Sequence, residues 1–132
     1  MNSEWREATR AGDLNRVCAL LDQGVDVDSL DEHGQTALMN AVYRGDLELT
    51  QLLIQRGADL NRTAKYRLTA LMLAVINNRA ELVRLIVEAG ADITIKGSKG
   101  SFDRTPLEYA QEHGHADIAS ILRSRIQPPT CC

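Results

Sequence analysis

Two histidines and two terminal cysteines form a group of residues whose types could bind zinc. His113 and His115 stand two positions apart, and Cys131 and Cys132 are adjacent. Imidazole and thiolate are the ligands that structural zinc sites use. Nothing in residues 126–132 holds the cysteines beside the histidines, so we expect a disordered tail there and no metal.

A second chemical candidate is the segment 97–101, with the sequence Gly-Ser-Lys-Gly-Ser. It looks superficially like a phosphate-binding loop. Such a loop requires a glycine, four residues and then Gly-Lys-Ser/Thr, placed between a strand and a helix. Both the spacing and the context differ here, so we expect an extended hairpin and no cofactor.

Nucleophilic catalysis has no motif in this sequence. Ser, His and Asp occur, but not as a nucleophile elbow or an ordered triad. Asp26, Asp59 and Asp92 recur at intervals of 33 residues, which indicates that the fold needs them. We expect a non-catalytic protein, and an enzyme or metalloprotein remains a less favoured alternative.

The interval of 33 residues extends well beyond the aspartates. Gly24, Gly57 and Gly90 share it, and Thr-Ala-Leu-Met occurs at residues 36–39 and again at residues 69–72. The last copy is displaced by 36 residues, since Thr105 follows Thr69, so three residues are inserted before it. A repeat of this length is typical of stacked units that bury their apolar faces against one another.

Each unit is predicted to contain two short helices and an extended connection. Thr36, Thr69 and Thr105 are candidate N-caps, because their hydroxyl groups can accept a hydrogen bond from a helix amide. Glycine or asparagine after each helix favours a left-handed end. Small alanines at 41, 74 and 110 would let neighbouring helices approach closely.

Composition bounds the possible partners. The chain has 132 residues, a net charge of −3, 44% hydrophobic and 4% aromatic residues. A weakly acidic chain with no basic tail is a poor candidate for nucleic-acid binding, and its apolar runs are too short to span a membrane. Three cysteines are an odd number that argues against a disulfide framework. We expect a cytoplasmic monomer without a signal peptide.

The repeated segments resemble the ankyrin repeat family over about residues 3–125. The resemblance rests on the Thr-Ala-Leu-Met motifs, Thr-Pro-Leu-Glu at 105–108, and the helix endings Leu-Leu-Ile-Gln-Arg-Gly at 52–57 and Leu-Ile-Val-Glu-Ala-Gly at 85–90. It implies an all-α solenoid of helix-turn-helix units with projecting β-hairpins or long turns. We expect one domain, 1–125, with units at about 3–28, 29–61, 62–94 and 95–125, the first and last acting as caps.

Departures from the family pattern carry further expectations. Trp5 aligns with Leu38 and Leu71, so we interpret it as a core residue. Ala64 and Arg67 stand where the second unit has an aspartate and a glycine, so the third turn should be less regular.

The resemblance also implies a binding surface for a protein or peptide on a concave face made of hairpin tips and first helices. The first unit contributes Arg10. The second contributes Glu32, His33, Gln35, Tyr43 and Arg44. The third contributes Lys65, Tyr66, Arg67, Leu68, Ile76 and Asn77. The fourth contributes Phe102, Arg104, Glu112 and His113.

Charge divides along the expected hairpins, which are acidic in the second unit and mainly basic in the third and fourth. Such an edge could orient a charged partner, or it could simply keep the protein soluble. The favoured function is a non-catalytic interaction module centred on Tyr66, Arg67 and Arg104. The main alternative is a structural or assembly subunit of a larger complex.

Overall fold

The computed structural model describes residues 3–98, 100 and 103–126. These residues form eight α-helices and one short 3₁₀ turn. They belong to two compact parts of the chain, each larger than one of the repeats discussed above. We call these parts unit 1 (Met1–Asp59) and unit 2 (Leu60–Cys132). The described part of the chain contains no strand, so the predicted all-helical class is confirmed and the connections are long turns.

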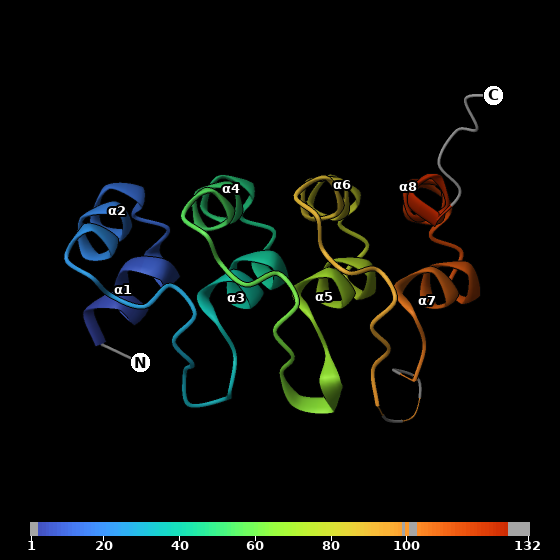
Figure 1. Ribbon diagram of the computed structural model, residues 1–132, viewed down its shortest axis with the longest axis horizontal. Helices are drawn as coiled ribbons and strands as arrows, with labels where there is room; N and C mark the ends of the chain where they lie inside the picture. Colours follow the sequence, from blue (N-terminus) through green and yellow to red (C-terminus); the bar gives the residue numbers. More distant parts are fainter. Residues whose placement is uncertain (1–2, 99, 101–102, 127–132) are drawn as a thin grey trace. The chain divides into compact units, whose positions relative to one another are not determined.

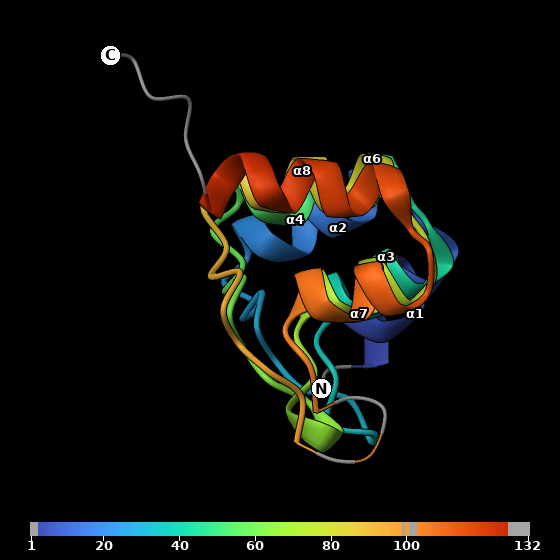
Figure 2. The same cartoon turned by 90° about the vertical axis from the view of Figure 1, so that its right-hand side faces the viewer.

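Unit 1 contains two helical repeats. Its helices are α1 (Ser3–Ala11), α2 (Leu14–Asp22), α3 (Ala37–Arg44) and α4 (Leu47–Gln55). Within this unit α1 and α3 form one layer and pack against each other, while α2 and α4 form the other layer (Figures 1 and 2). Residues 23–36 form a long turn that projects from the first layer (Figure 1).

Unit 2 contains the other two repeats. Its elements are η1 (Lys65–Arg67), α5 (Ala70–Ile76), α6 (Ala80–Glu88), α7 (Pro106–Glu112) and α8 (Ala116–Ile126). Helix α5 packs against α7 in one layer and α6 packs against α8 in the other. The turns before α5 and α7 project on the side of the first layer (Figure 1).

Side-chain capping determines where the first helix of each later repeat begins. The hydroxyl groups of Thr36, Thr69 and Thr105 each accept a hydrogen bond from the backbone amide three residues later, at 3.2–3.3 Å. Glu108 returns a hydrogen bond of 2.9 Å by accepting from the amide of Thr105, which completes a capping box. The three predicted caps are therefore confirmed, since each satisfies an amide with no partner inside its helix.

The ends of these helices use the left-handed conformation, as predicted. Gly45 ends α3 with a φ of 76°, and Asn78 follows α5 with a φ of 55°. Asparagine tolerates this region at modest cost because its short side chain can hydrogen-bond locally.

Buried side chains fill the space between the layers of each unit. In unit 1, Trp5, Ala8 and Ala41 are 0% exposed, which confirms Trp5 as a core residue. In unit 2, Ala74 and Ala110 are equally buried. Alanine at these positions leaves room for the helix backbones to approach. Cys18 lies on α2 as a half-exposed free thiol.

A recurring hydrogen bond joins consecutive repeats within each unit. In unit 1 the amide of Asp59 donates to Asp28 Oδ1 at 2.8 Å. In unit 2 the amide of Asp92 donates to Asn61 Oδ1 at 2.7 Å. Each donor lies 31 residues after its acceptor, so the side chain at the start of one connection fixes the backbone at the start of the next.

Candidate functional site

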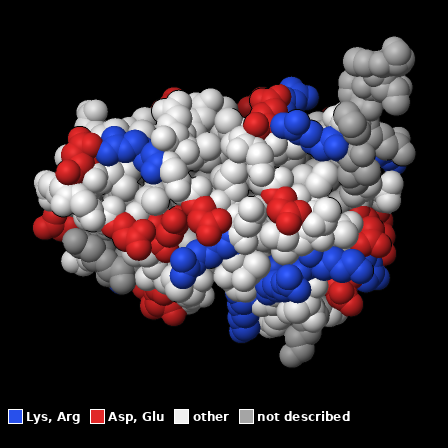
Figure 3. All heavy atoms as spheres, in the orientation of Figure 1, with Lys and Arg blue, Asp and Glu red and all other residues white. Residues whose placement is uncertain are grey.

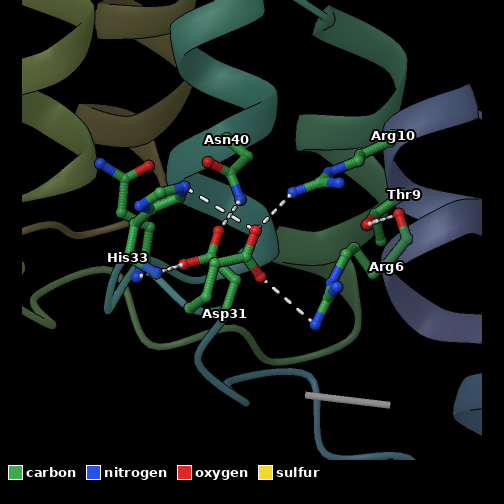
Figure 4. A network of polar contacts seen from close by, with 8 residues as sticks. Arg6, Thr9, Arg10, Asp31, His33 and Asn40 are labelled. Carbon is green, nitrogen blue, oxygen red and sulfur yellow. Dashed lines mark hydrogen bonds and ion pairs between the residues drawn. The ribbon is translucent and has the colours of Figure 1, made fainter. Parts of the chain in front are cut away.

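The expected surface residues of unit 1 centre on Glu32 at the tip of the 23–36 turn. Glu32 Oε1 lies 3.1 Å from Arg10 Nη2 and 3.7 Å from His33 Nε2, and Glu32 Oε2 lies 3.3 Å from Arg6 Nη2. Figure 4 shows Arg6 and Arg10 extending from α1 toward the turn that carries Asp31 and His33. The pKa of Glu32 is lowered, first by its own backbone amide and then by the hydrogen bond from Arg10.

Asp31 fixes the backbone of this tip. Its Oδ1 accepts hydrogen bonds from the amides of His33 (2.8 Å) and Gln35 (3.0 Å), and its Oδ2 accepts one from Asn40 Nδ2 (3.0 Å). Burial raises the pKa of Asp31, but the bonds from Asn40, Gln35 and His33 outweigh it and leave the pKa lowered. A carboxylate with these partners holds the turn in place.

The remaining expected residues of unit 1 differ in how freely they can bind. Tyr43 on α3 is 60% exposed, which makes it the most exposed large hydrophobic residue in the described chain. Arg44 follows it and donates a hydrogen bond of 2.6 Å to the carbonyl oxygen of Thr9, which ties α3 to α1. Gln35 is half-buried. Tyr43 is therefore the residue of this group best placed to contact a partner.

The turn before α5 carries the most unusual backbone of unit 2. Tyr66 has φ 61° and ψ 21°, and Arg67 has a φ of 60°. Left-handed backbone is costly for residues with a Cβ atom, by roughly 1–2 kcal/mol each. The corresponding tip in unit 1 uses Gly34, with a φ of 73°. The expected irregularity of the third turn appears in the left-handed Tyr66, whereas both turns form the same pair of backbone hydrogen bonds.

Hydrogen bonds hold this tip in place. The amide of Ala64 donates a hydrogen bond of 2.8 Å to the carbonyl oxygen of Leu68. The amide of Ser98 donates one of the same length to the carbonyl oxygen of Tyr66. The Tyr66 side chain is 37% exposed, and the Lys65 ammonium lies 5.2 Å from the centre of its ring. The tip thus presents an aromatic ring and cations from a fixed backbone.

Leu68 is placed differently from the expectation. It is only 9% exposed, so its side chain belongs to the interior of the turn and not to an exposed contact surface. Phe102 lies outside the described residues, as do residues 99 and 101 of the insertion.

Arg104 lies in the turn before α7 and is engaged by α7 itself. Its Nε donates to Glu112 Oε1 at 2.9 Å, and Nη1 donates to the carbonyl oxygen of Asp103 at 2.7 Å. The hydrogen bond with Glu112 is the main cause that raises the pKa of Arg104. Arg104 and Glu112 are therefore brought together as a pair that remains partly exposed.

His113 also packs onto its own helix end. Its ring stacks on Tyr109 with centroids 4.0 Å apart, and its Nδ1 lies 3.0 Å from the Tyr109 carbonyl oxygen. On α5 and just after it, Ile76 and Asn77 are half-buried, and the Asn77 amide group donates to the Leu73 carbonyl oxygen at 2.8 Å.

The zinc and phosphate sites considered from the sequence have no cluster of ligands in the described part of the chain. Residues 3–98, 100 and 103–126 contain no group of three or more His, Cys, Asp or Glu that could hold a metal ion. Cys131 and Cys132 lie outside those residues. In segment 97–101 the amide of Gly97 donates to the Arg104 carbonyl oxygen at 3.4 Å. Since the Ser98 amide is also engaged, neither is available to bind a phosphate.

Among the described residues, no helix has both the length and the apolar character to cross a membrane. A surface hollow of unit 2, of about 470 Å³, lies between α6 and α8. Arg84, Glu88 and Arg125 line it, and Arg125 donates to the Val87 carbonyl oxygen at 2.9 Å. This hollow belongs to the layer of second helices, whereas the expected surface belongs to the turns and first helices.

Two residues of these surfaces were missed by sequence reasoning. Arg6 binds Glu32 together with Arg10, and the signal was present, because residues four apart share one face of a helix. Ser98 fixes Tyr66 through its backbone amide, for which no side-chain pattern exists.

The repeats of this chain match a known protein family. A family model described as ankyrin repeats, with three copies, matches residues 6–97. No curated protein sequence matches the chain significantly. The matched stretch begins within α1 and contains the helices α2 to α6 and the turn with the left-handed Tyr66 and Arg67.

Proposed function

Because the chain belongs to the ankyrin repeat family, whose members are generally non-catalytic modules for protein–protein interaction, we propose that it binds a protein or peptide through its turn tips and first helices. We place the centre of binding in unit 2, at Tyr66, Arg67 and Arg104. The observation that carries this choice is the tip itself, where Tyr66 is 37% exposed on a backbone fixed by Ser98.

Aromatic and arginine side chains support the proposal because they contribute most of the binding energy at many interfaces. A tip that is already ordered loses little conformational entropy when it binds. In unit 1, Tyr43 offers a second exposed aromatic contact on a first helix. The half-exposed free thiol of Cys18 fits a reducing compartment, so we place this binding in the cytoplasm.

Affinity purification followed by calorimetry with the identified partner tests the proposal. The double variant Tyr66→Ala/Arg104→Glu should bind the partner several-fold more weakly while it unfolds at a similar temperature. Arg84→Glu/Arg123→Ala changes two exposed residues of α6 and α8 and should keep the affinity. Unchanged binding by the first variant would disprove the assignment.

A structural subunit is the alternative function. It predicts that the isolated chain is unstable and that a 1:1 complex survives gel filtration. Transient recognition predicts a chain that is stable alone and a complex that dissociates on dilution.

A further inference from the structure

The cations of the third repeat point to the kind of partner. We propose that residues 62–67 of unit 2, which we call the basic hairpin, bind an acidic stretch of a protein partner. Arg62, Lys65 and Arg67 would receive carboxylates, and Tyr66 would pack against apolar groups between them. This inference rests on the proposed function and adds the chemical class of the partner.

Unpaired charge is the first observation that supports the inference. Residues 60–69 contain three cations and no Asp or Glu. Among the ion pairs formed by the described residues, none involves Arg62, Lys65 or Arg67, although all three are exposed. Lys and Arg side chains gather over the turn side of unit 2 on the face drawn in Figure 3. Like charges this close repel one another, so an anionic partner would relieve the repulsion.

Neighbouring cations of unit 2 behave differently. Arg104 is paired with Glu112, and Lys96 lies close enough to Glu108 to help lower the pKa of that carboxyl, after the larger effect of its hydrogen bonds with Thr105. Arg104 and Lys96 of the fourth repeat thus have acidic neighbours within the fold, whereas Arg62, Lys65 and Arg67 form no ion pair among the described residues.

Backbone conformation is the second observation. Tyr66 and Arg67 both occupy the left-handed region, where the other positive-φ residues of unit 2 are glycines and Asn78. A glycine at either position would remove the cost. Strained backbone of this kind is concentrated at functional sites, and here it allows a ring and a guanidinium group to project from the tip.

A protein partner fits this surface better than a nucleic acid. The chain as a whole carries a net charge of −3, which opposes the approach of a long polyanion. A short acidic segment needs only the local cations.

Selection from a random peptide library displayed on phage, with the full chain immobilised, tests the inference. Peptides retained by the chain should be enriched in Asp and Glu relative to the unselected library. The variant Arg62→Glu/Lys65→Glu should bind the enriched peptides about tenfold more weakly, and it leaves the left-handed positions unchanged. Arg79→Glu/Arg84→Glu is the matched control, since both residues are exposed on or beside α6. It should keep the affinity.

The outcomes separate the inference from the proposed function. Enriched peptides without acidic residues, whose binding is still lost in Tyr66→Ala/Arg104→Glu, would overturn the acidic partner and leave the binding surface standing. Retention of no peptide above background would count against both. Fluorescence anisotropy with a labelled single-stranded DNA tests whether the basic hairpin binds nucleic acid. Tighter binding of DNA than of any enriched peptide, lost in Arg62→Glu/Lys65→Glu, would assign the basic hairpin to nucleic acid instead.

Discussion

The backbone amide of Ser98 donates a hydrogen bond of 2.8 Å to the carbonyl oxygen of Tyr66. Through this contact the turn of the fourth repeat supports the tip of the third. The bond uses no side chain, so any residue with an amide hydrogen can form it at position 98. The shape of the proposed binding tip therefore depends on a residue from the next repeat, outside residues 62–67.

Replacement of Ser98 by proline tests this support. Ser98→Pro removes the amide donor, so we expect the tip to open more readily and the Arg67 amide to exchange its hydrogen several-fold faster. Partner binding should weaken in parallel. Ser98→Ala keeps the donor and should leave both properties unchanged, as measured by hydrogen exchange and calorimetry. Equal exchange rates in the two variants would show that the bond contributes nothing.

Replacement of Arg67 by glycine should stabilise unit 2 and weaken binding. Glycine adopts a φ of 60° without steric cost, which we expect to raise the free energy of unfolding by about 0.5–1 kcal/mol after the entropic cost of glycine. Urea denaturation measures the change. Lys65→Gly is the control, because residue 65 is not among the positive-φ residues, and it should not stabilise. A lower free energy of unfolding in Arg67→Gly would contradict the conclusion that the backbone is strained at this position.

Removal of the Asn61 side chain should loosen the junction between the two repeats of unit 2. Asn61→Ala deletes the acceptor of the 2.7 Å hydrogen bond from the Asp92 amide, which we expect to lower the free energy of unfolding by about 0.5–1.5 kcal/mol. Asn61→Asp retains an acceptor, as Asp28 does in unit 1, and should lose less. A comparison of urea midpoints tests the order, and equal losses would refute it.

Acid should weaken the contact between the 23–36 turn and α1. The pKa of Glu32 is lowered in the folded state. Its contribution to stability is therefore complete above the unfolded pKa of a glutamate and is lost as the pH falls through the folded pKa. In Glu32→Gln the free energy of unfolding should depend less on pH over this acidic range. Glu48→Gln, on the exposed side of α4, should keep the dependence of the parent chain. If both variants retain it, the Glu32 contacts do not form in solution.

Local features of the fold were predictable from the sequence because each depends on a few neighbouring residues. Thr36, Thr69 and Thr105 cap helices through the amide three residues later, and the alanines at 8, 41, 74 and 110 are buried as their spacing indicates. The interval of 33 residues then repeats these local rules, so one repeat correctly interpreted predicts the others.

Whether a surface residue is exposed and unpaired was less predictable, because the side chains that it contacts come from distant positions in the sequence. Arg10 and Glu32 were both expected to face a partner, yet they bind each other across 22 residues. Leu68 directly follows the exposed tip residues Lys65, Tyr66 and Arg67 but is itself buried. The resemblance to a family indicates which positions line its binding surface, and it does not show which of them already have a partner in the fold.

Trp5 is the only tryptophan of the chain, and it lies fully buried in unit 1. Its fluorescence therefore gives an optical signal from one unit, against a background to which Tyr66 and Tyr109 of unit 2 contribute only tyrosine emission. Unfolding followed at once by tryptophan fluorescence and by circular dichroism can then show whether the two units melt together or in sequence. The unmodified protein thus carries its own probe of cooperativity along the repeat array.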